Sequence, residues 1–171
     1  ASLSTPFLSH RESLLQGSIQ IQKTAEYRVS DQISKFILDR CRTDAECSSR
    51  VYLSGSSAFW LNSWFDIEQV RGGGEMGSLN DWWPHGSYQI REGSRADLAQ
   101  VWLEALGVDT LVVHDMNSSE PYHDFRFPSK FEVMPEWEKI WEEDGDTIYR
   151  IRGNGFSAAR AADLSLEQLS S

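Results

Sequence analysis

The sequence predicts an α/β fold: a mixed sheet with a parallel strand–helix–strand core and a C-terminal antiparallel hairpin. The clearest helix, over residues 93–107, carries one apolar stripe and leads directly into a continuous apolar run over residues 108–115, which is typical of a buried central strand. A short buried strand over residues 50–55 precedes this helix, so the crossover predicts a parallel pair. Asp144-Gly145 is a hairpin-turn signal between two alternating segments, which predicts an antiparallel end to the sheet.

Before that core, the first helix is predicted over residues 30–41. Ser30 can cap its start, because a serine hydroxyl accepts a hydrogen bond from a backbone N–H of the first turn. Four residues recur at helical spacing and share one face: Ile33, Phe36, Ile37 and Cys41. In the later helix, Ser94 and Asp97 have the spacing of a capping box, and Gly107 suits a left-handed helix end.

Residues 56–86 form a long connection between the first strand and the later helix. Connections of this length are usually functional or contain short helices, and we expect helices near residues 57–64 and 84–91. The hairpin is predicted from residues 131–143 and 147–152, which flank the Asp-Gly turn.

The length of 171 residues favours a single domain with loosely attached ends. We expect an irregular lead-in over residues 1–26, the α/β domain over residues 27–152, and a tail or linker over residues 153–171. The net charge of −10 argues against nucleic-acid binding, which requires Lys and Arg to neutralise phosphates. The sequence has no run of about 18 apolar residues that could span a bilayer as a helix.

The two cysteines, Cys41 and Cys47, lie close together in the segment CRTDAEC. This spacing matches neither a C-x-x-C redox motif nor a zinc-ligand pattern. It permits a short-loop disulfide, which would indicate an oxidising compartment. The alternative is two free thiols at the end of a helix.

Four of the seven tryptophans fall in the long connection: Trp60, Trp64, Trp82 and Trp83. A flat indole with a polar tip suits the face of a sugar or a lipid interface. The alternative is that these rings fill the core under the connection. His85, next to this pair of tryptophans, is a candidate for a hydrogen bond to a ligand.

Two His-Asp pairs follow the predicted central strand, where open α/β sheets build their sites: His114-Asp115 and His123-Asp124. They could ligate a metal or act as acid and base, but their spacing matches no metal motif, so no metal is expected. The glycine run over residues 72–74 is not a dinucleotide-binding motif, so no cofactor is predicted. Asn117-Ser118-Ser119 fits the glycan-acceptor pattern N-x-[S/T], which also occurs by chance.

Several segments, taken in order, resemble one protein family. They read RVYLSGSSAFWLNSWFDIEQVRGG, NDWWPHGSYQI, WLEALGVDTLVVHD, SEPYHDF followed by PSKFE, and DGDTIYRI, and the likeness covers roughly residues 27–152. This order resembles the extracytoplasmic portion of the prokaryotic multi-spanning membrane proteins labelled 6-pyruvoyl-tetrahydropterin synthase-related, which look like glycosyltransferases acting on lipid-linked sugars. The resemblance implies a mixed α/β domain that follows a transmembrane region and faces the periplasm or the cell surface. It also implies that the catalytic carboxylate lies between membrane helices, so that this domain alone is not catalytic.

We therefore expect the domain to bind a glycan or a lipid-linked sugar through the aromatic connection, beside the transmembrane region of its own protein. Indole rings would stack on sugar or lipid-phosphate groups, and Arg71 could pair with a phosphate. The candidate ligand-binding residues are Trp60, Asn62, Arg71, Trp82, Trp83, His85 and Tyr88, with His114 and Tyr122 opposite. The alternative is a structural domain that packs on its own membrane helices or on a partner protein and binds no small ligand. An independent hydrolase is disfavoured, because the sequence has no nucleophile signature.

Overall fold

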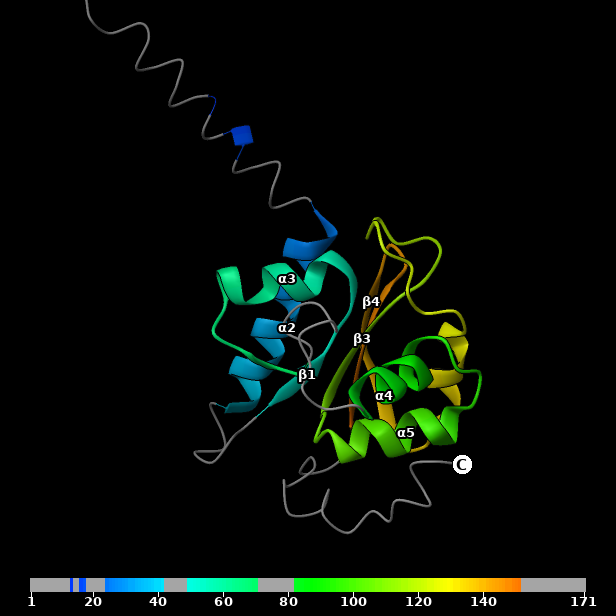
Figure 1. Ribbon diagram of the computed structural model, residues 1–171. Coiled ribbons are helices and arrows are strands. Elements are labelled where there is room, and N and C mark those ends of the chain that lie inside the picture. The colour runs from blue at the N-terminus through cyan, green and yellow to red at the C-terminus, as the bar shows by residue number, and fades with distance from the viewer. Residues whose placement is uncertain (1–12, 14–15, 18–23, 42–48, 71–81, 152–171) are drawn as a thin grey trace, which may run out of the picture.

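The computed structural model describes residues 13, 16–17, 24–41, 49–70 and 82–151, and these residues form an α/β domain (Figure 1). Their strands lie in one sheet, in the order β2-β1-β3-β5-β4. The strand bounds are β1 Arg50–Tyr52, β2 Glu68–Gln69, β3 Thr110–His114, β4 Trp137–Glu143 and β5 Asp146–Ile151. β1 pairs in parallel with β2 and β3, whereas β5 runs antiparallel to β3 and to β4. The predicted fold class is therefore confirmed.

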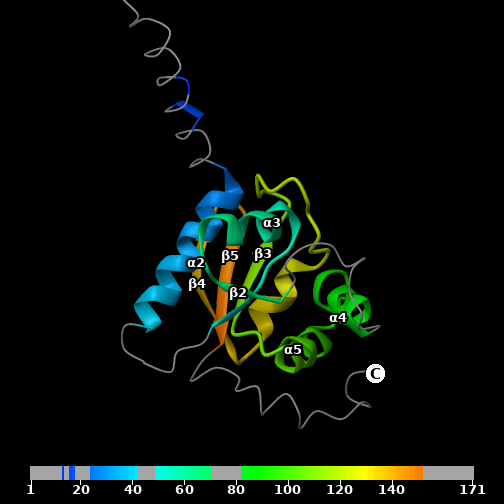
Figure 2. The same cartoon turned by 60° about the vertical axis from the view of Figure 1, so that its left-hand side comes forward.

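Helices cover both faces of this sheet (Figures 1 and 2). Their bounds are α2 Ala25–Cys41, α3 Gly55–Trp64, α4 Trp82–Arg91, α5 Ala96–Ala105 and the 3₁₀ helix η2 Pro128–Val133. One core layer joins α2 and α3 to the sheet, and a second joins α4, α5 and η2 to its other face. The two short helices expected in the long connection are thus present as α3 and α4.

The central strand β3 has all of its side chains buried. Successive side chains enter opposite layers, because Leu111 and Val113 pack with α4 and α5, whereas Val112 packs with α2 and α3. A strand buried on both faces needs a continuous apolar run, which is the pattern that predicted it.

The helix α2 begins at Ala25, earlier than predicted. The hydroxyl of Thr24 accepts the backbone N–H of Tyr27 at 3.3 Å and so caps the helix. Ser30 lies inside the helix, where its hydroxyl donates to the carbonyl of Glu26 at 2.6 Å. The prediction that Ser30 is the cap was wrong, because a serine hydroxyl can equally bond to the preceding helical turn.

The helix α5 begins at Ala96, after Arg95, whose side chain makes no capping hydrogen bond. The carboxylate of Asp97 accepts Nη2 of Arg95 at 2.5 Å. The predicted capping box between Ser94 and Asp97 is therefore wrong, because the guanidinium takes the carboxylate. The left-handed residue predicted at Gly107 is confirmed, with φ of +66°.

The C-terminal hairpin turns through Asp144 and Gly145, whose φ angles are 49° and 82°. Two consecutive residues of positive φ match the right-handed twist of the flanking strands, so the turn prediction is confirmed. The first predicted strand segment is wrong in part, because residues 128–133 form η2 and β4 begins only at Trp137. Pro128 favours the first turn of a helix, where its missing N–H costs nothing.

Some predictions fall outside the described residues. They concern Arg71, the tail over residues 153–171 and most of the lead-in over residues 1–26. Cys47 and the side chain of Cys41 also lie outside the described part, so their pairing stays a prediction. Among the helices that are described, none combines the length and the apolar character needed to cross a membrane.

Candidate functional site

The carboxyl ends of the parallel strands β1, β2 and β3 lie together along one edge of the sheet, and the chain has a topological switch point there. From β1 the chain passes to β2 on one side and then reaches β3 on the other side. Open α/β sheets bind ligands in the crevice outside the strand ends at such a point. The segments that meet at this edge are residues 54–57 after β1 and the connection over residues 115–127 after β3.

A buried polar cluster occupies this edge on the α2–α3 face. We define it as Arg28, Ser56, Ser57, His114, Ser118, Glu120 and Asp146. His114, Glu120 and Asp146 are fully buried, each with an exposed fraction of 0%. Burying a polar or charged group is costly unless it is hydrogen-bonded, so the partners of these side chains matter. Within the described residues, Nε of Arg28 and Nε2 of His114 have no hydrogen-bond partner.

Asp146 lies at the centre of the cluster. Its Oδ1 atom lies 2.8 Å from Nδ1 of His114 and accepts the hydroxyl of Ser118 at 2.5 Å. Its Oδ2 atom accepts Nη2 of Arg28 at 2.6 Å. Burial alone would raise the pKa of Asp146, but the bonds from His114, Ser118 and Arg28 outweigh burial and lower it below its ordinary value. This carboxylate therefore ties β3 and β5 to α2.

Glu120 fills the N-terminal turn of α3. Its Oε1 atom accepts the backbone N–H and the hydroxyl of Ser56, at 2.8 and 2.6 Å. Its Oε2 atom accepts the same two groups of Ser57, at 3.1 and 2.7 Å. The first N–H groups of a helix lack partners within the helix, so a carboxylate is stabilised there. Burial would raise the pKa of Glu120, but the bonds from Ser56 and Ser57 and the nearby His114 lower it overall.

Gly55 is required for this arrangement. Its φ of +71° lies in the left-handed region, and a Cβ atom added to it would lie 2.6 Å from Oε1 of Glu120. Because His114, Glu120 and Asp146 are fully buried, they cannot touch a substrate in this conformation. Their role is structural, because their hydrogen bonds hold α2, α3 and the connection after β3 at fixed positions.

An exposed aromatic row runs along α4. We define it as Trp82, His85 and Tyr88, which follow one another at intervals of three residues and lie on one side of the helix. Trp82 and Tyr88 expose 51% and 49% of their surface. The adjoining side packs closely on α5, since a Cβ atom added to Gly86 would lie 2.4 Å from the ring of Trp102, whose centroid also lies 5.7 Å from that of His85. The core therefore holds one side of α4 and leaves the aromatic row open.

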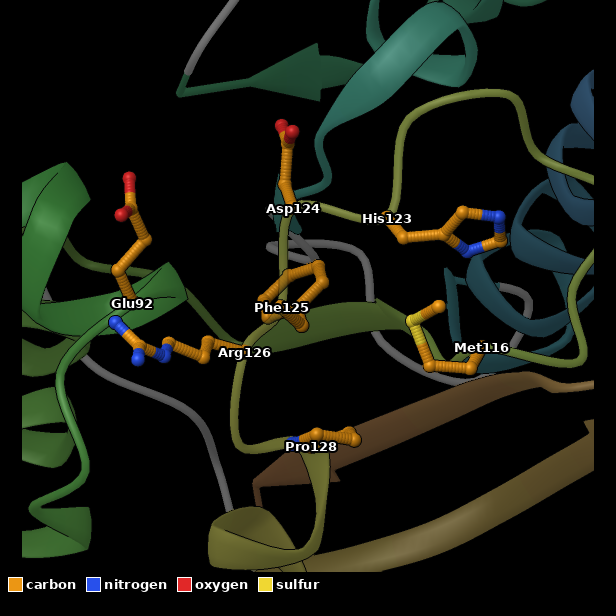
Figure 3. Close-up of a pocket in the computed structure, with 7 residues that line it drawn as sticks. All are labelled: Glu92, Met116, His123, Asp124, Phe125, Arg126 and Pro128. Carbon is orange, nitrogen blue, oxygen red and sulfur yellow. The ribbon is translucent and has the colours of Figure 1, made fainter.

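An open groove of about 430 Å³ lies between the end of α4 and the connection after β3 (Figure 3). Its lining residues are Glu92, Met116, His123, Asp124, Phe125, Arg126 and Pro128. Nη1 of Arg91 donates to the carboxylate of Asp124 at 3.1 Å. Nδ1 of His123 lies 2.8 Å from the carbonyl oxygen of Asp115. Glu92 follows Tyr88 by one helical turn, so the groove begins where the aromatic row ends.

The predicted ligand-binding residues lie in several places rather than on one surface. Trp82, Trp83, His85 and Tyr88 belong to α4, whereas Trp60 and Asn62 belong to α3, on the opposite face of the sheet (Figure 1). His114 is buried in the polar cluster, and Tyr122 is exposed in the connection after β3.

Three of these residues have local structural roles. Trp83 packs against the α4–α5 core, with its ring centroid 6.4 Å from that of Tyr52. Nδ2 of Asn62 donates to the carbonyls of Phe65 and Ile67, at 3.3 and 2.7 Å, and so closes the end of α3. Trp60 stacks on Trp64 at a centroid distance of 5.6 Å. For Trp83 the alternative of a core position holds in part, since the ring is only half-buried.

Sequence reasoning did not find the other members of the polar cluster. Asp146 follows the Asp-Gly turn and reads as an ordinary turn residue. Glu120 lies in an irregular connection and carries no local signal. The run of small residues over 54–57 after a strand was the one usable sign, because such a segment at a helix start often meets an anion.

Within the described part of the chain, His, Cys, Asp and Glu side chains form no group of three or more that could hold a metal ion. No protein-family model matches the chain, and comparisons with curated proteins and with solved structures found no match either.

Proposed function

We propose that this chain is the extracytoplasmic domain of a membrane glycosyltransferase-like protein and that it binds a glycan or a lipid-linked acceptor along α4. The segments that resemble this protein family support the first part of the proposal. The exposed aromatic row beside the groove supports the second part, and it is the observation that carries the proposal.

The region around α4 combines the two kinds of contact that a sugar needs. The apolar face of a sugar ring packs on an aromatic ring, which Trp82 and Tyr88 offer to solvent. Sugar hydroxyls need hydrogen-bond partners, and the groove supplies carboxylate and imidazole groups. The guanidinium of Arg126 adds a partner for the phosphate of a lipid-linked acceptor.

In this proposal the domain positions the acceptor and does not carry out the transfer. The family resemblance implies that the reacting carboxylate belongs to loops between membrane helices. The carboxylates of the groove, Glu92 and Asp124, would then bind hydroxyl groups of the ligand. The domain would act by holding one substrate close to the membrane surface, which raises its local concentration at the reaction site.

A titration of the chain with neutral disaccharides, followed by tryptophan fluorescence and calorimetry, tests the binding claim. We expect saturable binding that Trp82→Ala and Tyr88→Ala each weaken by about two- to tenfold, since an aromatic contact contributes roughly 0.5–1.5 kcal/mol. Trp60→Ala is the matched control, because Trp60 is 50% exposed but lies on α3. Absence of binding at millimolar sugar, or a loss of affinity in Trp60→Ala alone, would overturn the claim.

A second candidate function is a structural domain that packs on its own membrane helices or on a partner protein. The exposed aromatic surface of α3 favours it, because Phe59 and Trp60 expose 60% and 50% of their surface. A pocket of about 230 Å³ beside them is lined by Thr24, Glu26, Trp60 and Trp64. Under this function, replacement of Phe59 and Trp60 by Ser lowers the melting temperature of the full-length protein in membranes but not that of the isolated chain. Equal effects in both settings would contradict it.

A further inference from the structure

Asn117 lies in an exposed turn that the proposed function does not use. The turn follows β3 and contains Asn117-Ser118-Ser119, in which a serine stands two residues after the asparagine. The other asparagines of the chain lack Ser or Thr at that position: Asn62, Asn80 and Asn154. The sequence therefore contains a single match to the N-x-[S/T] pattern of glycan acceptors.

The turn presents the two outer residues of this motif to solvent and anchors the middle one. Asn117 and Ser119 are exposed, whereas Ser118 is only 7% exposed. The hydroxyl of Ser118 donates to the buried carboxylate of Asp146 at 2.5 Å and accepts the backbone N–H of Glu120 at 2.9 Å. Because Ser118 is held in this way by the polar cluster, its two neighbours face outward.

The amide group of Asn117 is oriented but still reachable. Its Nδ2 atom donates to Oδ2 of Asp115 at 3.3 Å, and its backbone N–H donates to Oδ1 of the same residue at 2.6 Å. An amide nitrogen carries two hydrogens, so this bond leaves the second hydrogen outside the Asp115 contact. The hairpin turn packs closely on the backbone of this segment, since a Cβ atom added to Gly145 would lie 2.3 Å from the backbone nitrogen of Ser118.

We propose that Asn117 is a glycan-acceptor site that receives an oligosaccharide from a polyprenyl phosphate or diphosphate carrier. The inference rests on the proposed extracytoplasmic position of the chain, because N-glycosylation marks surface loops of exported proteins. In the transfer, the bond between C1 of the sugar and the carrier phosphate oxygen breaks, and a bond between C1 and Nδ2 of Asn117 forms. Nδ2 loses one proton, and the carrier leaves as its phosphate or diphosphate.

The position of Asn117 gives the modification a structural consequence. Met116, the preceding residue, lines the groove at the end of α4 (Figure 3). A glycan on Asn117 would therefore stand at the rim of that groove, on the same edge of the sheet as the polar cluster.

Peptide mass spectrometry of the full-length protein, purified from the cells that naturally make it, tests the proposal. We expect the peptide containing Asn117 to carry additional mass in steps of sugar residues. Asn117→Gln and Ser119→Ala should remove that mass, whereas Ser119→Thr should retain it, because threonine also satisfies the motif. Both residues are exposed, so these variants should keep the wild-type melting temperature, which is measured alongside.

Protease treatment of intact cells separates a failure of this inference from a failure of the proposed function. A chain that is cleaved from outside but carries no glycan on Asn117 overturns the inference and leaves the proposed location standing. A chain that is protected until the cells are opened, and that carries no glycan, overturns both. A glycan that persists in Ser119→Ala contradicts the role of the motif.

Discussion

The buried polar cluster and the aromatic row on α4 differ in their exposure to solvent. His114, Glu120 and Asp146 expose 0% of their surface, whereas Trp82 and Tyr88 expose 51% and 49%. This is the reverse of the ordinary distribution, in which charged side chains face water and large aromatic side chains are buried. The carboxylates of Glu120 and Asp146 are retained in the interior because both oxygens of each are hydrogen-bonded, and clustered exposed aromatic rings often mark a binding surface. We therefore assign a structural role to the cluster and keep α4 as the proposed binding surface.

The largest expected effect is that of Asp146→Ala. Removing this carboxylate leaves Arg28 and His114 without their buried partner, which should lower the free energy of unfolding by about 3–5 kcal/mol. Urea denaturation of the variant and the wild type measures the difference.

Glu143→Ala is the matched control for that variant. Glu143 also lies near Arg28, at 4.0 Å, but its side chain is 52% exposed. Exposed ion pairs contribute little, so this variant should lose less than about 1 kcal/mol. Similar losses of unfolding free energy in Asp146→Ala and Glu143→Ala would show that the buried polar cluster stabilises the fold no more than an exposed ion pair does.

The next effect is that of Gly55→Ala. The added methyl group would meet the carboxylate of Glu120 at a backbone φ of +71°, so we expect a loss of about 2–3 kcal/mol in the free energy of unfolding. Gly107→Ala is the comparison, because Gly107 has φ of +66° but its nearest neighbour is the flexible tip of Arg50 at 3.3 Å. It should lose only about 1 kcal/mol. Equal losses, measured by denaturation, would mean that Glu120 does not occupy the start of α3.

Two adjacent tryptophans provide a comparison within α4. Trp83 packs against the core, so Trp83→Ala should lower the free energy of unfolding by about 2 kcal/mol. Trp82 lies in the exposed row, where its ring centroid is 6.5 Å from that of His85, so Trp82→Ala should lower it by less, about 1 kcal/mol. Thermal or urea unfolding of both variants checks this order, and the opposite order would contradict the described orientation of α4.

The pH dependence of stability should also distinguish the cluster. The pKa values of Asp146 and Glu120 are lowered in the folded protein, whereas unfolded carboxyl groups titrate at about 4. As the pH falls below about 4, the unfolded state binds protons that the folded state does not, so the free energy of unfolding decreases. Melting temperatures recorded over a pH series should show this decline in the wild type and a shallower one in Glu120→Gln. An identical slope in both proteins would exclude Glu120 as a source of the decline.

The sequence contains the main signals for the fold because they are local. The continuous apolar run ending at His114 predicted β3, and the Asp144-Gly145 pair predicted the hairpin. Both features depend on neighbouring residues alone. The N-terminal cap of α2 was misplaced, because Ser30 and Thr24 are equally capable of capping and only the fold selects between them.

The candidate site was harder to predict because its contacts join distant parts of the chain. His114 was expected beside a ligand, but β5 pairs antiparallel with β3 and brings Asp146 directly opposite it. The position of a histidine after an apolar run gives no sign of that register. Trp82, His85 and Tyr88 were named as candidates from their residue types, but neither their alignment along α4 nor their separation from Trp60 was predicted. Both follow from the helix α4 and from the placement of α3 and α4 on opposite faces of the sheet.

The most direct test asks whether a ligand binds at the aromatic row on α4 and not at the polar cluster. It uses nuclear magnetic resonance spectra of the ¹⁵N-labelled chain, recorded during a titration with a neutral disaccharide. The proposed function predicts shifts of the amide and indole signals of Trp82 and of the amide signal of Tyr88. The signals of Trp60, Ser56 and Ser57 should stay unchanged, because α3 lies on the other face of the sheet and Glu120 fills its first turn. Shifts at Ser56, Ser57 or Trp60 without shifts on α4 would contradict it.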